Sequence, residues 1–175
     1  MAENQIREAN ITDAAGIARI HVVTWQHAYR GQMPDDYLDG LSIAQRTQTW
    51  IALLSNSYPK AHTLVALEGD QVAGFCSVGA SPNEDADAQN GELFAIYVDP
   101  QAMGKGIGSA LIAEGENWLR ADGFTHATLW VLATNAPSIR FYEHQGWSAD
   151  GVTKTDMMGV FPLHELRYAR RLDQV

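Results

Sequence analysis

Residues 92–108 read ELFAIYVDPQAMGKGIG and form the most informative segment of the sequence. It opens with an apolar run, Glu92 to Val98, which is typical of a buried β-strand. Asp99-Pro100 ends the strand, because proline lacks the N–H that a sheet ladder needs. The glycines at 104, 106 and 108 then lead into apolar residues at helical spacing. The stretch therefore predicts a strand that runs into the glycine-rich N-terminus of a helix.

Such a junction is suited to binding an anion. Glycine lets the backbone approach a ligand closely, and the free N–H groups and dipole of a helix N-terminus favour phosphate oxygens. Two nucleotide motifs do not fit, because a Rossmann fingerprint needs glycine where this chain has Ser109, and a P-loop is not completed by Gly104-Lys105-Gly106. A glycine-rich turn that only begins a helix is the alternative at this point.

Residues 135–147 read NAPSIRFYEHQGW and form a second motif. Together with Gln101-x-x-Gly104-x-Gly106, it resembles the GCN5-related N-acetyltransferase (GNAT) superfamily. The segments 25–31 and 34–38 also look like small bacterial members of that superfamily. The resemblance is close over residues 92–147 and loose over the order of the remaining elements.

The other elements follow from capping residues and periodicity. Thr12 is the expected N-cap of a first helix that ends near Gly31, and Ser42 is the expected cap of a helix that carries Trp50. We expect strands near 5–9, 63–67, 72–78, 92–98, 128–132, 147–152 and 164–170, and helices near 34–38, 107–123 and 135–145. This order indicates a mixed α/β (α+β) domain. The resemblance implies a GNAT fold over residues 1–175 as a single domain, with a central mixed, mostly antiparallel sheet, splayed strands and flanking helices.

Composition excludes several classes of protein. The chain has 12 Lys+Arg and 21 Asp+Glu, a net charge of -9, which argues against a nucleic-acid partner. The single cysteine, Cys76, excludes a disulfide scaffold and a multi-cysteine zinc site. No metal is expected, because the spacing of His27, His62, His126, His144 and His164 fits no metal site. We expect a cytoplasmic protein with no membrane partner, since we find no signal peptide and no apolar run of roughly 20 residues.

The resemblance implies that acetyl-CoA binds where the strand 92–98 and the following parallel strand splay apart. Main-chain groups of the strand would pair with the pantetheine arm, and amides from Met103 to Ser109 would hold the pyrophosphate. Many members have a basic residue just before the first glycine, where this chain has Met103. The difference affects one expected phosphate contact and does not affect the expected fold. The cofactor-binding residues implied are Ile96, Tyr97, Val98, Gln101, Met103, Gly104, Lys105, Gly106, Ile107, Gly108, Ser109, Asn135, Ser138 and Tyr142.

Acetyl transfer to an amine needs a base and an acid. An alkylamine with a pKa of about 10.4 is almost wholly protonated at neutral pH, and the leaving thiolate of CoA benefits from a proton. Tyr142 matches the acid of many family members; its alternative role is to pack its helix against the sheet. Glu92 is the expected base, acting directly or through water, because strand alternation places it with Phe94, Ile96 and Val98 on one partly desolvated face. The alternative is a glutamate at a solvated strand end. The backbone N–H of Val98 is a candidate to stabilise the negative charge on the thioester oxygen.

The acceptor pocket is expected to use residues of the N-terminal helices. His21, Trp25 and Tyr29 share one helix face by their spacing, and Tyr37 follows on the next helix. Aromatic rings could hold an ammonium group by cation–π contact, and the alternative is that this aromatic stripe belongs to the core. Acidic residues at 84, 85 and 87 are either a solvated surface or a means of attracting a cationic amine.

These observations predict an acetyl-CoA-dependent N-acetyltransferase that modifies a primary amine of a small molecule by direct attack in a ternary complex. Cys76 has no apparent base partner, so an acetyl-cysteine intermediate is not expected. One alternative is an enzyme that acetylates a protein or peptide amine. Another is a module that binds acyl-CoA as a sensor without turnover. The resemblance leaves a homodimer open.

Overall fold

The computed structural model describes residues 5–172, whose strands form one seven-stranded sheet in the order β1-β2-β3-β4-β5-β7-β6. Neighbouring strands are antiparallel except for β4 and β5. The strands are β1 Gln5–Glu8, β2 His62–Glu68, β3 Gln71–Ala80, β4 Asn90–Val98, β5 His126–Leu132, β6 Ser148–Met158 and β7 Phe161–Arg171. The expected mixed, mostly antiparallel sheet is confirmed, and β6 and β7 are longer than predicted.

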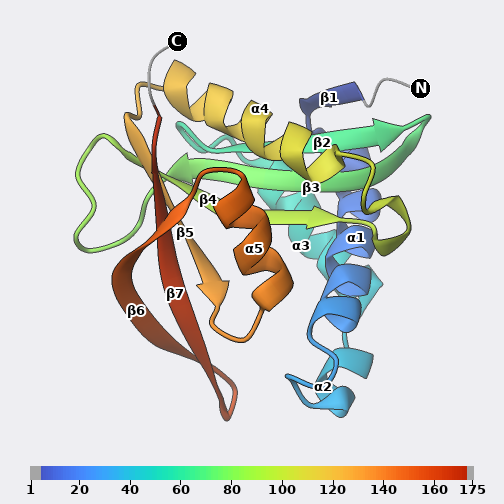
Figure 1. Ribbon diagram of the computed structural model, residues 1–175. Coiled ribbons are helices and arrows are strands. Elements are labelled where there is room, and N and C mark those ends of the chain that lie inside the picture. Colours follow the sequence, from blue (N-terminus) through green and yellow to red (C-terminus); the bar gives the residue numbers. More distant parts are fainter. Residues whose placement is uncertain (1–4, 173–175) are drawn as a thin grey trace.

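Helices cover both faces of this sheet (Figure 1). They are α1 Ala14–Ala28, α2 Asp35–Asp39, α3 Ile43–Ser55, α4 Ile107–Ala121 and α5 Ala136–His144, with short 3-10 turns η1 Ile11–Asp13 and η2 Pro100–Ala102. On one face, Leu111 and Ile112 of α4 belong to a buried cluster with the strands. On the other face, Ile17 of α1 and Trp50 of α3 enclose Phe75 of β3. No helix within residues 5–172 combines the length and the apolarity needed to cross a membrane.

The first helix begins differently from the prediction. The helix α1 starts at Ala14 with Asp13, not Thr12, at its N-cap position and no side-chain cap. The cap lies one turn earlier, at the 3-10 turn η1 that leads into α1: Asn10 Oδ1 accepts a hydrogen bond from the Thr12 backbone N–H (2.9 Å), and the Asp13 carboxylate accepts one from the Asn10 backbone N–H (2.8 Å). This reciprocal capping box satisfies two N–H groups that the first turn leaves free. At the other end α1 stops at Ala28, before the expected Gly31.

A β-bulge in β4 changes the expected alternation of side chains. Ala95 lies opposite Ser77 in β3, whereas Leu93 lies opposite Val78, so Phe94 has no partner in the register. An extra residue in one strand reverses which face its neighbours occupy. Ile96 and Val98 therefore face α4 together with Leu93, and Glu92 faces the opposite side. The prediction that Glu92 shares a face with Ile96 and Val98 is wrong for this reason.

Strands β4 and β5 pair for only a short distance. Their parallel register joins Asn90–Glu92 to His126–Thr128 and includes no later residue of either strand. Figure 1 shows the two strands running in different directions beyond this point, with α5 beside them. The splayed strands implied by the resemblance are present.

Close packing between β3 and α4 depends on Gly74. A Cβ at this position would lie 2.9 Å from the Tyr97 carbonyl oxygen and 3.1 Å from Leu111 Cδ1. We predict that Gly74→Ala lowers the free energy of unfolding by about 1–3 kcal/mol, because the backbone must shift to accept the methyl group. Urea denaturation measures this change, with Gln71→Ala as a control at an exposed position of the same strand. Equal stability of Gly74→Ala and the wild type would contradict this account of the packing.

Candidate active site

One cavity of about 1080 Å³ lies where β4 and β5 separate. Its wall brings together the C-terminal half of β4, the glycine-rich turn, α5, the end of α1, and residues of β5, β6 and β7. The expected site residues that line it are Trp25, Tyr29, Glu92, Ile96, Tyr97, Val98, Met103, Gly104, Gly106, Ile107, Gly108, Ser109, Asn135, Ser138 and Tyr142. Segments that are distant in the sequence thus meet at one place.

At its glycines, the turn presents backbone to this cavity. Gly104 and Gly106 have φ angles of 79° and 80°, in the left-handed region that favours glycine. Gly106 is the N-cap of α4, so the free N–H groups of the first helical turn follow it directly. The turn therefore offers the donors of an anion site without a basic side chain.

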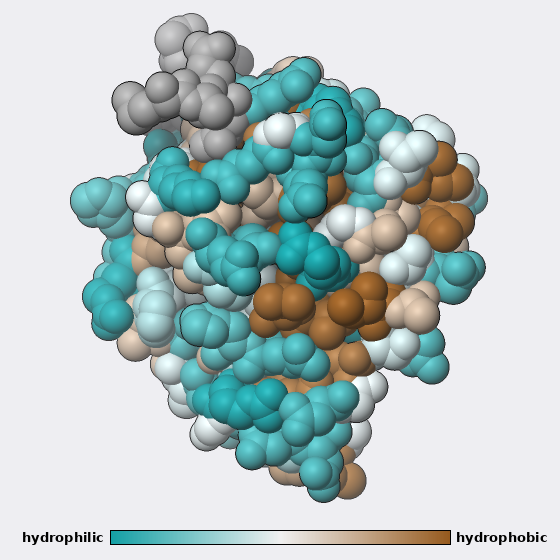
Figure 2. All heavy atoms as spheres, turned by 90° about the vertical axis from the view of Figure 1, so that its right-hand side faces the viewer, coloured by the Kyte–Doolittle hydropathy of each residue, from teal (hydrophilic) through white to brown (hydrophobic). Residues whose placement is uncertain are grey.

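Two expected cofactor residues lie outside the cavity wall. The Lys105 ammonium lies 2.8 Å from the Glu68 carboxylate and pairs with it, and the Gln101 side chain is exposed. Met103 is half-exposed and lines the cavity. Figure 2 shows the side of the molecule on which α1, α2 and the turn after β4 lie in Figure 1; hydrophobic side chains form a band there between hydrophilic ones.

Helix α5 is fixed at both ends. Asn135 caps it, with Oδ1 accepting a hydrogen bond from the Ser138 backbone N–H at 3.3 Å. The Gln145 side chain donates a hydrogen bond to the Ser109 hydroxyl (2.9 Å) and so ties the end of α5 to the start of α4. Tyr142 lies between these anchors, and its hydroxyl has no hydrogen-bond partner among the described side chains. Burial raises the pKa of Tyr142 well above its usual range, so the phenol keeps its proton at neutral pH.

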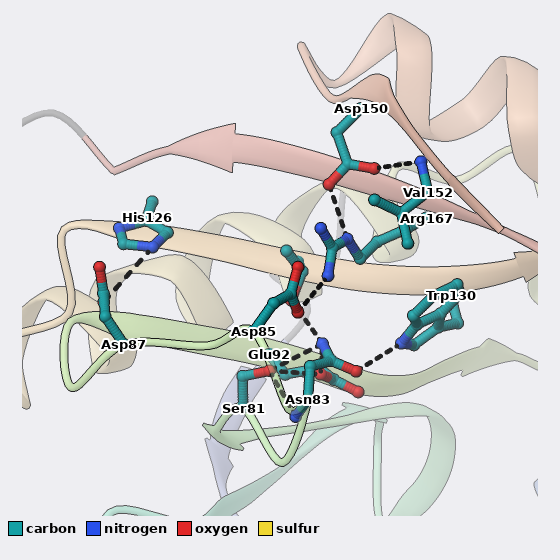
Figure 3. A network of polar contacts seen from close by, with 11 residues as sticks. Ser81, Asn83, Asp85, Asp87, Glu92, His126, Trp130, Asp150, Val152 and Arg167 are labelled. Carbon is teal, nitrogen blue, oxygen red and sulfur yellow. Dashed lines mark hydrogen bonds and ion pairs between the residues drawn. The ribbon is translucent and has the colours of Figure 1, made fainter. Parts of the chain in front are cut away.

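Glu92 is buried, with 6% of its surface exposed, so it is not at a solvated strand end. Its Oε2 accepts hydrogen bonds from the Ser81 hydroxyl and the Asn83 amide, both at 2.9 Å. Figure 3 shows this network, in which Trp130 donates in turn to Asn83 Oδ1 (3.1 Å). Burial raises the pKa of Glu92, although the two hydrogen bonds and the charge of Lys154 act against that rise. One carboxylate oxygen is thus held, and Oε1 is left without a partner among the described residues.

An ion-pair cluster holds the acidic loop that carries Ser81 and Asn83. Arg167 on β7 donates to Asp85 (2.7 Å) and to Asp150 (2.6 Å), as Figure 3 shows. The hydrogen bond from Arg167 lowers the pKa of Asp85. Part of the acidic run is therefore neutralised by a partly buried arginine and positions the donors of Glu92.

The aromatic stripe of α1 divides between the cavity and the core. Trp25 and Tyr29 line the cavity, and their rings meet at 5.2 Å between centroids. His21 does not line it; its ring stacks on Tyr97 at 5.3 Å, and burial lowers its pKa to about 4. Tyr37 lines a separate hollow between α2 and α3. The structure thus brings two of the four expected acceptor residues to the cavity.

Among the residues of the cavity wall that were not predicted, four stand close together and carry charge or an aromatic face: Trp130, Lys154, Asp156 and Glu165. They lie on β5, β6 and β7, which are neighbours in the sheet. Lys154 and Asp156 fall beyond the residues expected for β6, so the sequence placed them in no element. The signal that would have revealed a longer strand is the β-branched residues Val152, Thr153 and Thr155, followed by a turn at Gly159.

Among residues 5–172, no three His, Cys, Asp or Glu residues are grouped so that they could hold a metal ion. The cavity wall carries ionisable groups suited to proton transfer and charge recognition, among them Glu92, Tyr142, Lys154, Asp156 and Glu165.

Comparisons with known proteins agree with this arrangement. The sequence model of the acetyltransferase (GNAT) family matches residues 15–147. An uncharacterized N-acetyltransferase of Bacillus subtilis (strain 168), YuaI, is 34% identical over 138 residues, which cover 79% of this chain and 76% of that protein. The chain therefore belongs to the GNAT family of acetyltransferases, and the expectation of an acyltransferase is confirmed.

Solved structures show the same fold. The PaiA N-acetyltransferase of Thermoplasma acidophilum, in complex with coenzyme A, has a TM-score of 0.73 at 20% identity, over 95% of this chain and 98% of that chain. A putative acetyltransferase of Salmonella typhimurium, yncA, with acetyl-CoA, has a TM-score of 0.72 at 22% identity, over 99% of this chain and 96% of that chain. At these identities the likeness establishes the fold.

The raised pKa of Glu92 predicts an effect on stability. A carboxyl group whose pKa is higher in the folded state than its ordinary value of 4.5 stabilises the fold below that value, and this contribution is lost as pH rises through the folded-state pKa. We predict that Glu92→Gln is more stable than the wild type at neutral pH, and that the difference shrinks as pH falls through the folded-state pKa of Glu92 and is small below 4.5. Chemical denaturation across this range measures it.

Glu84→Gln is the control, because Glu84 is an exposed carboxylate outside the network. Its stability difference from the wild type should stay small at every pH. A Glu92→Gln protein that is less stable than the wild type at neutral pH would show that the hydrogen bonds of the carboxylate outweigh its desolvation.

Proposed function

We propose that this protein transfers the acetyl group of acetyl-CoA to a primary amine of a small molecule, by direct attack in a ternary complex. The observation that carries the proposal is that one cavity joins the glycine-rich turn to Glu92 and Tyr142. Family membership supports the reaction class, and the coenzyme A and acetyl-CoA in the two related structures support the donor.

The residues present fit acetyl-CoA. The cavity volume of about 1080 Å³ is at the upper limit for ligand pockets, which suits a large cofactor together with an acceptor. Beyond Glu92 the register between β4 and β5 stops, so backbone groups of Ile96, Tyr97 and Val98 are available to an extended ligand. The amides from Met103 to Ser109 suit a pyrophosphate. The cofactor supplies an activated acetyl group as a thioester.

Glu92 is suited to remove the proton from the attacking ammonium. Because Ser81 and Asn83 hold Oε2, Oε1 has a defined direction in which to accept a proton, from the amine or from an intervening water. Its raised pKa brings the carboxylate closer to neutral pH, which makes it a stronger base than an exposed glutamate.

Tyr142 is suited to protonate the leaving sulfur. Its phenol is neutral, because burial raises its pKa, and its hydroxyl is not engaged by another described side chain. Direct transfer is favoured over an acetyl-cysteine intermediate, since burial raises the pKa of the Cys76 thiol to about 12 and leaves little thiolate.

Substitution of the two proposed catalytic residues tests the mechanism. We expect Tyr142→Phe to lower kcat by on the order of 10²-fold without weakening acetyl-CoA binding, because only the proton donor is lost. In the wild type, kcat/KM should rise with pH through the raised pKa of Glu92, and Glu92→Gln should lose this acidic limb. Free thiol released from acetyl-CoA with a panel of amines measures the rates, and calorimetry measures the binding. Unchanged rates in both variants would overturn the roles assigned.

The glycine-rich turn can be tested by a matched pair of substitutions at the two ends of α4. Gly106 and Gly123 both have positive φ, 80° and 90°, so valine at either site should cost roughly 1–2 kcal/mol of stability. Only Gly106→Val should also weaken coenzyme A binding, by about tenfold or more, because its side chain enters the anion site. Calorimetric titration with coenzyme A compares the two. If the two variants bind coenzyme A with equal affinity, the pyrophosphate does not bind at the glycine-rich turn.

A further inference from the structure

The ammonium group of Lys154 is surrounded by Trp130, Asp156 and Glu165, and we call these four side chains the charged wall. The Lys154 Nζ lies 2.8 Å from Asp156 Oδ2 and 3.3 Å from Glu165 Oε2. It also lies 4.6 Å from the centroid of the Trp130 ring. Two carboxylates and an aromatic face are the usual partners of a cation. In this structure the protein's own lysine takes that place.

The charged wall is joined to the proposed base. Trp130 donates a hydrogen bond to Asn83, and Asn83 donates one to Glu92. The charge of Lys154 also acts on the pKa of Glu92, which places the two groups in one electrostatic environment. The proposed base and the charged wall therefore lie in the same cavity and share one hydrogen-bonded residue, Asn83.

The balance of charge in the cavity favours a cation over an anion. Three carboxylates line it, those of Glu92, Asp156 and Glu165, against the single ammonium of Lys154. Glu165 is the more enclosed of the two carboxylates that contact Lys154, with 19% of its side chain exposed against 58% for Asp156. Enclosed charges are screened less by water, so Glu165 contributes more to the field in the cavity. A carboxylate on the acceptor would be repelled by these negative charges.

The side chain of Lys154 has access to solvent from its place in the charged wall. Its side chain is 36% exposed, and a lysine stem can carry the ammonium into water while its methylene groups stay on the protein. An incoming ammonium would then remake the contacts with Glu165 and Trp130. When an ammonium of the acceptor replaces that of Lys154, the carboxylates of Asp156 and Glu165 still have one cation beside them.

We propose that the acceptor is a diamine or polyamine, whose second ammonium replaces that of Lys154 against Glu165 and the ring of Trp130. The inference rests on the acetyl transfer proposed above, because it assigns the acceptor side of the same cavity. Lys154 then acts as an internal competitor and sets the preference for acceptors with two positive charges.

Binding measurements test this site separately from turnover. We would titrate the protein with 1,4-diaminobutane, butylamine and 4-aminobutanoate by calorimetry. The wild type should bind the diamine about tenfold more tightly than butylamine, and Glu165→Gln should lose that preference. Lys154→Met should bind the diamine several-fold more tightly than the wild type, because the competing ammonium is gone. Glu68→Gln, which removes the carboxylate of a similar lysine pair outside the cavity, is the control and should match the wild type.

The opposite results would overturn the proposal. These are equal affinity for diamine and butylamine, a preference that survives in Glu165→Gln, or tightest binding of 4-aminobutanoate that is lost in Lys154→Met. The last would make Lys154 a contact for an acceptor carboxylate. Release of free thiol with the same amines separates the two hypotheses. Diamine preference without thiol release would reject the acetyl transfer alone, whereas thiol release without any diamine preference would reject the charged wall alone.

Discussion

Strands β4 and β5 pair through three residue positions and then separate, and the cavity depends on this separation. A parallel pair needs a crossover connection, which here is α4. The connection leaves β4 at its carboxyl end, so the N-terminus of α4 must lie at the mouth of the gap between the strands. Topology alone thus brings together two features that bind ligands: a strand with unpaired backbone groups and a helix N-terminus with free N–H groups.

The bulge at Phe94 reconciles this topology with a carboxylate in the same strand. Leu93 and Ile96 both pack in the cluster beneath α4, and a strand without a bulge could not place both there. The extra residue lets the apolar side chains stay under α4 while Glu92 faces the other side, next to Ser81 and Asn83. The burial that raises the pKa of Glu92 and the hydrogen bonds that orient it therefore have one structural origin.

The sequence predicted those parts of the fold that depend on residues close together in the chain. The strand from Glu92, the glycine-rich turn and the α5 cap at Asn135 all lie where their residues indicate, because proline, glycine and capping side chains act within a few residues. The bulge could not be predicted, since strict alternation was assumed and the extra residue is decided by pairing with β3. The partnership of Asn83 with Glu92 and Trp130 depends on loop closure across the sheet, which no local pattern encodes. His21 shares a helix face with Trp25, but whether a residue on that face meets the core or the cavity depends on how far β4 extends beside it.

The two sides of the cavity use different sources of charge, and this difference bears on how donor and acceptor can be bound together. In the proposed reaction the donor is a polyanion and the acceptor a cation. Backbone N–H groups are what the glycine-rich turn offers to the anion, since Met103 brings no charge and Lys105 is paired with Glu68 outside the cavity. Backbone dipoles act mainly within the first turn of a helix. The negative field of Glu92, Asp156 and Glu165 on the acceptor side is therefore left largely intact, whereas an unpaired lysine or arginine that faced the cavity from the turn would reduce it over a longer range. A cofactor site made of glycines is in this way compatible with a cavity that attracts amines.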